Sequence, residues 1–475
     1  MAGIILAADI GTSSLKAAFI DFDGKLLAYN RAPYKPEENG DITAAEWERA
    51  FARALESLRS RASLRAIDGI CISGNGPTLV PLTAGGDALP VLYWHDSRKA
   101  APPVSQRPVK QAQPRDSFFL PQAAWLKKNA LPLYEKVNLF LSSHEWLAFR
   151  LGAEPRTVLP SGSYEKYYWD KEQCDLFGLD MAKFPPFIKM GNVMGHLSKE
   201  AASRLALPSG NLLKSGTPII AGAPDFISAL IGTGTITPGD VCDRAGSSEG
   251  INACADEPLQ GQGFRLLPHV FDGLWNAGIV INSSGRLFDS FRKKAGLENT
   301  PYGELLKELI PSSTGKDVFE NLDFSSPSLL AAALPKSGST LELGRSVLCV
   351  MAFSVKHALE TLAAIPFPVS LMRLSGGQSK SARWNQLKAD ITGVSLSLPE
   401  ISDAELAGNA IIAVHALEAG AGELQEASFK SLVKRLIRFR AKYEPESCNK
   451  DFWESRYRLY IKNNSRQEYP KESKL

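Results

Sequence analysis

The chain begins with Gly3-Ile-Ile-Leu-Ala-Ala-Asp9-Ile-Gly-Thr-Ser-Ser-Leu-Lys16, in which two apolar runs flank a turn of small polar residues. The first run is typical of a buried strand, and the second continues to Phe22. Asp23-Gly24 follows and predicts a hairpin turn before a third strand. The chain is therefore expected to open as an antiparallel meander with a polar hairpin after its first strand.

The hairpin after the first strand carries residue types that suit phosphate oxygens. Gly11 allows a tight backbone turn, and Thr12 and Ser13 supply hydroxyl and amide donors. Successive N–H groups in such a turn form a concave nest for phosphate. Lys16 adds positive charge, and Asp9 can hold water on Mg²⁺. An ordinary polar hairpin capped by an aspartate is an equally good interpretation of this segment alone.

The composition is that of a soluble globular protein. A chain of 475 residues is too long for one ordinary core, which predicts two domains. Its 54 basic and 51 acidic residues give a formal charge of only +3, so nothing favours a nucleic-acid or membrane-surface partner. The six cysteines are dispersed without a Cys-x-x-Cys pair, and no apolar run reaches the roughly 18–20 residues of a membrane span. We therefore expect a cytoplasmic protein with reduced thiols.

One segment near the end of the chain is strongly basic. Residues 426–442 read as a single amphipathic helix, with its basic residues at Lys430, Lys434, Arg435, Arg438, Arg440 and Lys442. No aromatic stacking platform accompanies them, which favours a solvated helix face over a nucleic-acid site.

Two later segments place polar groups beside predicted strands. Gly222-Ala-Pro-Asp225 follows a buried strand, where a lone aspartate is usually a turn former. Ser375-Gly-Gly-Gln378 lies between a strand and a helix, and its flat turn can lie against a purine, with polar contacts from Gln378, Ser381 and Asn385. A tight turn before a capped helix explains this second segment equally well.

The usual nucleotide-binding signatures are absent from the sequence. It contains no Gly-x-x-x-x-Gly-Lys-Ser/Thr, and no Gly-x-Gly-x-x-Gly follows a strand and opens a helix. Nucleotide binding of the P-loop or dinucleotide-fold kind is therefore excluded. Arg244-Ala-Gly-Ser-Ser248, at the start of the second half, is similar to the first hairpin and hints at an internal repeat.

Taken in order, these segments resemble the FGGY family of carbohydrate kinases, in particular its xylulokinase and gluconokinase branches. The resemblance runs from the first residues to about 420. It rests on Asp9–Lys16, Ile72-Ser-Gly74, Leu92-Tyr-Trp-His-Asp-Ser-Arg98, Gly216–Asp225, Gly246-Ser-Ser248 and Gly376–Gly393. It implies an α/β fold of two actin-like (ribonuclease H-like) domains with a nucleotide cleft between them.

The resemblance also implies a division of the chain. We expect an N-terminal domain over 1–238, which carries the substrate and phosphate side with the catalytic aspartate. A C-terminal domain over 239–442 carries the adenosine side, and a helical tail covers 443–475. The turn cluster Ile236-Thr-Pro-Gly-Asp240 marks the boundary between the two domains.

The family's functional residues carry over by motif. The cofactors implied are ATP and Mg²⁺, with Asp225 as general base and with Asp9 (through water) and Asp225 as metal ligands. The nucleotide-binding residues implied are Gly11, Thr12, Ser13, Lys16, Ser247, Gly376, Gly377, Gln378 and Ser381. The substrate-binding residues expected are Asn75, Trp94, Asp96, Asp225 and Phe226.

The substrate implied is a small sugar, sugar acid or polyol, such as a pentulose, and the family similarity suggests a homodimer. The chain departs from xylulokinases where their Gln-Met-His-Gly is replaced by Asn75-Gly-Pro-Thr78, and where an amide after the catalytic aspartate is replaced by Phe226. These changes remove hydrogen-bond partners for a sugar, which costs roughly 1–3 kcal/mol for each hydroxyl left unpaired. They argue against D-xylulose.

Two alternatives belong to other functional classes. A catalytically weak sugar- and nucleotide-binding regulator of the same fold would account for the substrate-side departures, although Asp9, Asp225 and the adenosine segment are intact. An actin-like or chaperone-like ATPase would act on protein partners. The Trp94-x-Asp96-x-Arg98 segment, which resembles part of a small-molecule pocket, speaks against that second alternative.

Overall fold

The computed structural model describes residues 3–38, 40–61, 66–100, 117–205, 212–282, 284–311, 316–320, 322, 324, 340–362, 369–420 and 425–464. The chain divides into two compact units. Unit 1 comprises Met1–Gly232, Pro268–Gly273 and Ala404–Ile437, and unit 2 comprises Thr233–Leu267, Leu274–Asp403 and Arg438–Leu475.

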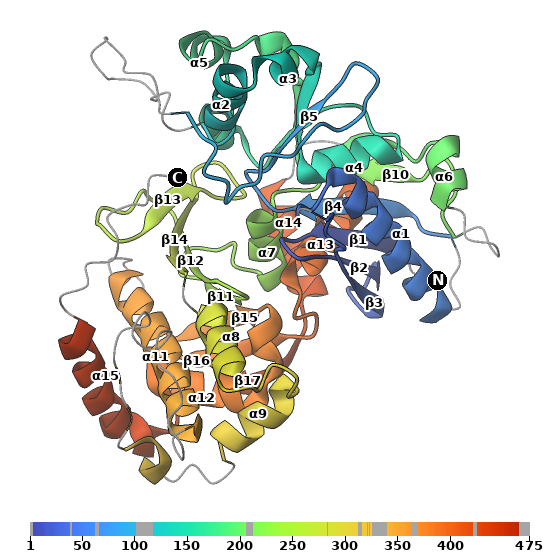
Figure 1. Cartoon of the computed structure of the whole chain (residues 1–475). Coiled ribbons are helices and arrows are strands. Elements are labelled where there is room, and N and C mark those ends of the chain that lie inside the picture. The colour runs from blue at the N-terminus through green and yellow to red at the C-terminus, as the bar shows by residue number, and fades with distance from the viewer. Residues whose placement is uncertain are drawn as a thin grey trace. The chain divides into compact units, whose positions relative to one another are not determined.

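Unit 1 is built on a six-stranded sheet with the order β3-β2-β1-β4-β10-β9 (Figure 1). Its strands are β1 (Ile4–Ile10), β2 (Ser14–Asp21), β3 (Leu26–Pro33), β4 (Gly69–Gly74), β9 (Val193–His196) and β10 (Pro218–Ile220). β1, β2 and β3 form the antiparallel meander expected from the sequence, while β4 and β10 run parallel to β1. Every residue of β1 is buried, so the hairpin that follows it is held by the middle of the sheet.

Helices from distant parts of the chain pack on this sheet and on one another. α1 (Ala44–Arg61), α4 (Ser143–Leu151) and α13 (Ala404–Ala419) contact the strands, while α7 (Asp225–Thr233) and α14 (Glu426–Leu436) contact α13. α1 packs on β2 and β3, and its apolar side chains, which include Trp47, Phe51 and Leu55, are buried. α13 packs on β1 and β4, which brings residues beyond 400 onto the first strand of the chain.

The rest of unit 1 consists of shorter elements between β4 and β10. They are β5 (Leu79–Leu82), α2 (Leu120–Asn129), α3 (Leu131–Lys136), β6 (Leu139–Ser142), β7 (Thr157–Leu159), α5 (Lys171–Leu176), β8 (Phe187–Lys189) and α6 (Lys199–Leu205). β5 pairs with β6 and β7 pairs with β8, so this region forms two small sheets apart from the main one. α4 begins with a capping box between Ser142 and Glu145.

Unit 2 is built on a seven-stranded sheet with the order β13-β14-β12-β11-β15-β16-β17. Its strands are β11 (Val241–Ala245), β12 (Glu249–Ala255), β13 (Arg265–Pro268), β14 (Trp275–Ile281), β15 (Leu371–Ser375), β16 (Ser395–Pro399) and β17 (Phe439–Tyr443). β11 is antiparallel to β12 and parallel to β15, and β16 continues the parallel part of the sheet.

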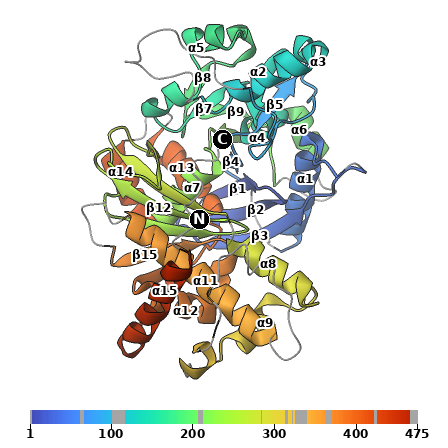
Figure 2. The same cartoon turned by 60° about the vertical axis from the view of Figure 1, so that its left-hand side comes forward.

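The helices of unit 2 are α8 (Ser284–Lys294), α9 (Tyr302–Leu309), α11 (Thr340–Thr361), α12 (Ala382–Thr392) and α15 (Lys450–Asn464). Figure 2 shows α11 beside α12 and α15. One part of α11 joins the apolar core over the sheet through Val355 and Ala358. Another part packs on α15, with the Phe353 ring centroid 6.5 Å from that of Trp453 and 5.8 Å from that of Tyr457.

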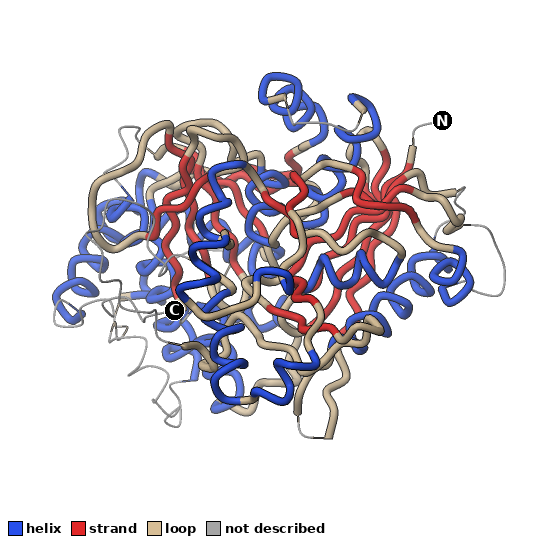
Figure 3. The backbone as a smooth tube through the Cα atoms, turned by 90° about the horizontal axis from the view of Figure 1, so that it is seen from above, coloured by secondary structure: helices blue, strands red, loops and turns tan. Residues whose placement is uncertain are grey.

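The two large sheets share one strand topology. The order β3-β2-β1-β4-β10 in unit 1 matches β14-β12-β11-β15-β16 in unit 2, with the same parallel and antiparallel pairs. Figure 3 shows the strands of each sheet gathered together with helices along them. The similarity between the hairpins at Gly11 and Gly246 therefore reflects equivalent positions, because each hairpin joins the first two strands of its sheet.

The structure differs from the sequence predictions in the bounds of the domains and in one helix. Pro268–Gly273 and Ala404–Ile437 belong to unit 1, and residues 233–238 belong to unit 2, although the predicted domains ran over 1–238 and 239–442. The packing of α13 on β1 and β4 accounts for the largest of these differences. Residues 426–442 do not form one helix, since α14 ends at Leu436 and the following residues pair with β16 as β17.

No helix in the described part of the chain has both the length and the hydrophobicity that crossing a membrane requires.

A glycine contact between α7 and α13 provides a test of unit 1. A Cβ atom on Gly408 would lie 1.9 Å from the backbone oxygen of Ser228, so no side chain fits there. We expect Gly408→Val to lower the free energy of unfolding by about 3 kcal/mol or more, measured by urea denaturation. Gly303→Ala in α9, where a Cβ meets nothing within 4 Å, is the control and should change stability by less than about 1 kcal/mol. A Gly408→Val variant as stable as the control would contradict the packing of α7 on α13.

Candidate active site

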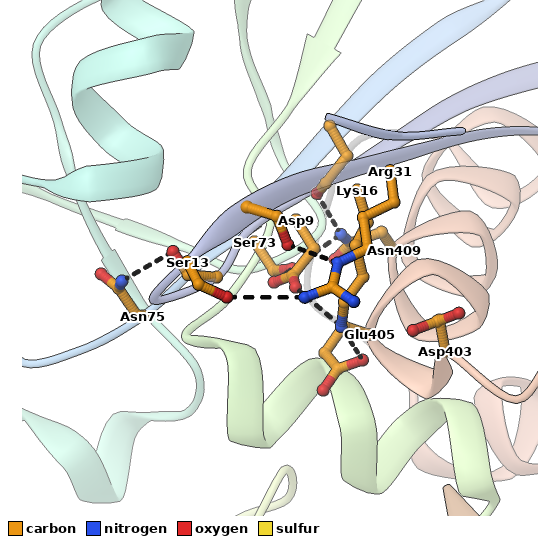
Figure 4. A network of polar contacts seen from close by, with 12 residues as sticks. Asp9, Ser13, Lys16, Arg31, Ser73, Asn75, Asp403, Glu405 and Asn409 are labelled. Carbon is orange, nitrogen blue, oxygen red and sulfur yellow. Dashed lines mark hydrogen bonds and ion pairs between the residues drawn. The ribbon is translucent and has the colours of Figure 1, made fainter. Parts of the chain in front are cut away.

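Asp9 lies near the carboxyl end of β1, and the strand register places a polar side chain on each side of it (Figure 4). It is opposite Lys16 in the pairing with β2 and opposite Ser73 in the pairing with β4. The Ser73 hydroxyl donates a hydrogen bond of 2.8 Å to Asp9 Oδ1, and Lys16 Nζ lies 3.5 Å from Asp9 Oδ2. Three neighbouring strands therefore build the surroundings of one buried carboxylate.

α13 contributes two more polar side chains to this network. Glu405 Oε2 lies 3.4 Å from Lys16 Nζ, so the ammonium group lies within ion-pair distance of two carboxylates. Asn409 Nδ2 donates to the backbone oxygen of Ala8 at 2.7 Å and to Ser73 Oγ at 2.9 Å. Asn409 Oδ1 in turn accepts a hydrogen bond of 2.9 Å from Ser228 of α7. The amide of Asn409 thus ties β1, β4 and α7 together.

The surroundings of Asp9 change its acidity. The pKa of Asp9 is raised to about 7, mainly by burial, and the nearby Lys16 ammonium opposes this rise. The negative charges of Glu405 and Asp225 contribute to the raised pKa, so Asp225 lies close enough to act on Asp9 electrostatically. A site that holds two carboxylates near one another in partial burial favours a bound cation, because the cation stabilises both charges.

The turn after β1 presents its hydroxyl groups outward. Gly11 N donates to the backbone oxygen of Ser14 at 3.1 Å, which closes the turn, and the side chains of Thr12 and Ser13 are exposed. Arg31 on β3 reaches the same turn, where its Nε donates to Ser14 Oγ at 2.8 Å and its Nη2 to Ser13 Oγ at 3.5 Å (Figure 4). The hairpin therefore combines the exposed side chains of Thr12 and Ser13 with the positive charge of Arg31, and both features suit an anion.

Asp225 is the first residue of α7, shortly after β10. The chain between β10 and α7 approaches β4 closely, because a Cβ on Gly222 would lie 2.0 Å from the backbone oxygen of Ile72. A bridge between Gly74 and Pro224 extends this contact. The close approach of backbone to backbone holds Asp225 near the end of β4, the strand next to β1.

Phe226 follows Asp225 in the sequence, and its ring contacts that of Tyr164. Phe226 is half-buried, and its ring centroid lies 6.5 Å from that of Tyr164. Tyr164 is itself fixed, since its hydroxyl donates to the backbone oxygen of Pro268 at 2.6 Å. An apolar surface therefore adjoins the carboxylate at the position where the family resemblance led us to expect an amide.

The segment at Trp94 belongs to the region between β5 and α2. Asp96 forms an ion pair with Arg98 and also accepts a hydrogen bond of 2.8 Å from the Arg98 backbone N–H. Partial burial opposes ionisation of Asp96, but the hydrogen bonds from Arg98 outweigh it and hold the pKa below its ordinary value. Asp96 is thus a partly buried, charged acceptor that is paired with Arg98.

The equivalent hairpin in unit 2, between β11 and β12, contacts the turn Gly376-Gly377-Gln378. Gly246 N donates to the backbone oxygen of Ser248 at 2.9 Å, and Gln378 Nε2 donates to Gly246 O at 2.9 Å. Gly376 has a φ of +87°, and a Cβ there would lie 2.4 Å from Ala245 O, so only glycine fits. The turn that contains Ser247 therefore lies beside the Gly376-Gly377 segment.

Ser381 caps the N-terminus of α12, where its hydroxyl accepts a hydrogen bond of 3.3 Å from Trp384 N. The adjacent short helix begins at Gly377, and a Cβ on Gly377 would meet no atom within 4 Å. Gly377 therefore faces open space within unit 2, unlike Gly376.

A buried ion triad joins the two strands of the hairpin at Gly246 to α12. Lys388 Nζ lies 2.6 Å from Asp243 Oδ2 and 2.5 Å from Glu249 Oε1, and all three side chains are at most 1% exposed. Asp243 lies on β11, Glu249 on β12 and Lys388 on α12. The triad fixes the two hairpin strands to the helix that follows the Gly-Gly turn.

The sequence predictions and the structure can be compared residue by residue. Within unit 1 the structure brings Asp9, Lys16 and the hairpin together with Asp225, and within unit 2 it brings Ser247 together with Gly376 and Gln378. The sequence analysis missed Asn409. Its one sequence signal is a polar amide within the apolar run Leu406-Ala-Gly-Asn-Ala-Ile-Ile412 of a buried helix. The sequence analysis also missed Lys388, because the role of a buried lysine is visible only when its two carboxylate partners are known.

The repeated sheets and their hairpins define the class of protein, which is the two-domain actin-like ATPase fold. The structure superimposes on ligand-bound xylulose kinase from Lactobacillus acidophilus with a TM-score of 0.75 at 18% sequence identity, over 98% of each chain. At that identity the likeness concerns the fold.

Sequence comparisons identify the family. The model of the N-terminal domain of the FGGY family of carbohydrate kinases matches residues 4–232, and the model of its C-terminal domain matches residues 329–417. The chain belongs to the FGGY family and is a carbohydrate kinase, for which ATP is the phosphate donor. It is 23% identical to xylulose kinase of Bacillus subtilis, over 96% of this chain and 95% of that protein, and 22% identical to autoinducer-2 kinase of Salmonella paratyphi B, over 94% and 91%.

The buried triad of unit 2 yields a stability prediction. Lys388→Met leaves two carboxylates buried without their cation, so we expect a loss of about 3–5 kcal/mol in the free energy of unfolding, measured by urea denaturation. Lys380→Met is the matched control, since Lys380 is 54% exposed and lies 3.8 Å from Asp403 in a surface pair, which limits its effect to about 1 kcal/mol. Equal stability of the two variants would show that the triad does not hold the hairpin to α12.

Proposed function

We propose that this carbohydrate kinase transfers the γ-phosphoryl group of ATP to a hydroxyl of a small sugar, sugar acid or polyol, with Asp225 as general base. The observation that carries the proposal is the position of Asp225 beside the end of β4, the strand whose Ser73 donates a hydrogen bond to Asp9. Asp225 begins α7 beside the end of β4, and its charge acts on the buried carboxylate that precedes the phosphate-binding hairpin. A carboxylate in that position can meet a hydroxyl group that attacks a phosphate held by the turn.

The proposed reaction is an in-line displacement. The Asp225 carboxylate accepts the proton of the sugar hydroxyl while that oxygen forms a bond to the γ-phosphorus, and the bond from phosphorus to the bridging oxygen of ADP breaks. Thr12 and Ser13 donate to phosphate oxygens, Lys16 adds positive charge in unit 1, and Ser247 provides the equivalent contact in unit 2. Because phosphoryl transfer depends mainly on positioning and charge neutralisation, these donors supply most of the acceleration.

The carboxylates of unit 1 fit a magnesium ion that arrives with the nucleotide. Magnesium is usually held by one or two carboxylates together with water and substrate phosphates, and Asp9 and Asp225 are such a pair. In the described residues no group of three or more His, Cys, Asp or Glu side chains is arranged to hold a metal ion. We propose that Asp9, through water, and Asp225 hold Mg²⁺, which when bound neutralises charge on the phosphates.

We assign the adenosine side to unit 2. Gly376, Gly377, Gln378 and Ser381 line the turn between β15 and α12, where the backbone is bare at Gly377 and amide and hydroxyl groups lie nearby. A flat, side-chain-free backbone suits the face of a purine, and the polar groups suit its edge. The prediction of a cleft between the two domains follows from the family resemblance.

The sugar side is assigned to Trp94, Asp96, Asp225 and Phe226. Asn75, which the sequence analysis expected to contact the sugar, is buried, and both ends of its side-chain amide form hydrogen bonds within unit 1. Asp96 is charged and partly buried, so its carboxylate can accept a hydrogen bond from a sugar hydroxyl. The relatives include kinases named for xylulose and for autoinducer-2, so the family accommodates different small acceptors. The apolar Phe226 beside the base favours an acceptor with a deoxy or otherwise less polar carbon at that point. The homodimer and the cytoplasmic location stay predictions.

The proposal is tested by ADP release with ATP and Mg²⁺ across a panel of pentuloses, aldonates, polyols and deoxy sugars. We expect one class of acceptor to stimulate ADP release well above the rate without sugar. Release that no acceptor stimulates, together with intact ATP binding, would contradict the proposal and favour a sugar-binding regulator.

Replacement of the proposed base separates chemistry from binding. Asp225→Asn keeps the shape and the start of α7, so ATP should bind within about threefold of the wild-type affinity while turnover falls by about 10²–10⁴-fold. Turnover is measured by ADP release and binding by calorimetry. Asp175→Asn, at an exposed carboxylate of α5, is the control and should keep full activity. Near-normal turnover of Asp225→Asn would remove this residue from the role of base.

The open position at Gly377 tests the adenosine assignment. Gly377→Phe should fold, because no atom lies within 4 Å of its Cβ, yet the ring would occupy the space assigned to the nucleotide. We expect the Michaelis constant for ATP to rise by about tenfold or more, with a smaller change for the sugar. Unchanged constants in a folded variant would place adenosine elsewhere.

A further inference from the structure

The residues that replace the sugar-binding side chains of xylulokinases form hydrogen bonds inside the protein. Asn75 follows β4 and is 2% exposed, and Thr78 is completely buried. Asn75 Nδ2 donates to the backbone oxygen of Gly11 at 3.1 Å, and Asn75 Oδ1 accepts from Thr78 Oγ1 at 3.0 Å. Thr78 Oγ1 in turn accepts a hydrogen bond of 3.3 Å from the backbone N–H of Trp94. Both polar ends of the Asn75 side chain are therefore used within unit 1.

These bonds form one continuous chain with a single direction. From Trp94 N–H to the Thr78 hydroxyl, to the Asn75 amide and to Gly11 O, each group donates to the next, so the bonds polarise one another. Backbone bonds fix Asn75 independently, since its N–H donates to Ile10 O at 2.9 Å and its carbonyl accepts from Ser143 Oγ at 3.0 Å. The series of hydrogen bonds is therefore fixed in its middle at Asn75. One of its ends lies in the hairpin after β1 and the other in the Trp94 segment.

We propose that Thr78 and Asn75 are positioning residues that couple acceptor binding at the Trp94 segment to the geometry of the phosphate-binding hairpin. This inference rests on the proposed function, in which Trp94 contacts the sugar and the hairpin contacts phosphate. A sugar that orders the Trp94 backbone strengthens the bond to Thr78, and the amide of Asn75 holds Gly11 O in the conformation that presents Thr12 and Ser13. Because binding linkage is reciprocal, the nucleotide tightens sugar binding by the same factor.

The test measures this coupling directly. Calorimetry gives the dissociation constant of Mg²⁺ with the non-hydrolysable ATP analogue adenylyl imidodiphosphate, without and with the panel sugar that stimulates ADP release most strongly. The ratio of the two constants is the coupling factor. We expect it to be about fivefold or more in the wild type.

Thr78→Val removes the hydroxyl at nearly unchanged volume and leaves Trp94 N–H and Asn75 Oδ1 without their partner. We expect the coupling factor to fall to about one, while each single dissociation constant stays within about threefold of the wild type. Thr78→Ser keeps the hydroxyl and should keep the coupling. If Thr78→Val does not fold, Thr78→Ala, which also lacks the hydroxyl and cannot clash, provides the same comparison.

The matched control is Thr157→Val in β7 of the same unit. Thr157 is 1% exposed and its hydroxyl has no hydrogen-bond partner among the described residues, so this variant makes the same buried substitution outside the chain of bonds. It should keep the wild-type coupling factor. A merely structural role for Thr78 would lower stability in Thr78→Val but leave its coupling factor unchanged, and that result would overturn the inference.

A wild-type coupling factor of one would overturn it as well. Failure of the proposed function has a different signature, because then no sugar in the panel stimulates ADP release from the wild-type protein at all.

Discussion

The burial of one carboxylate in the middle of a sheet is the constraint on which the rest of unit 1 depends. Asp9 sits where β1 meets the hairpin, and an isolated ionised group in that position would be costly. Three elements share its stabilisation: β2 supplies Lys16, β4 supplies Ser73, and α13 supplies Glu405 as a second partner for Lys16. The return of the chain beyond residue 400 onto β1 is therefore part of the site as well as of the core.

The two sheets solve the same geometrical problem with different chemistry. Each begins with a hairpin of small residues, and each hairpin must be held still if it is to bind phosphate. In unit 1 the amide of Asn409 ties the strands to α7. In unit 2 the ammonium of Lys388 joins Asp243 and Glu249 to α12. A repeated topology thus preserves the position of the hairpin, while its support differs between the units.

Local patterns in the sequence predicted much of the fold and part of the site. The meander, the hairpin at Gly11 and the strand before Asp225 were predictable because apolar runs and turn residues are local signals. Asn409 and Lys388 were not, since their roles depend on strand register and on partners far away in the chain. Residues 439–442 were assigned to a helix as the end of an amphipathic segment over 426–442, but they pair with β16 as part of β17.

The central claim is that the two carboxylates of unit 1 serve transfer of phosphate to a sugar rather than to water. The most direct test follows the γ-phosphate of ³²P-labelled ATP in the presence of the acceptor panel. The account predicts that the label appears in a sugar phosphate ester and that Asp225→Asn abolishes this product. Label found only as inorganic phosphate, at the same rate with and without sugar, would contradict the account.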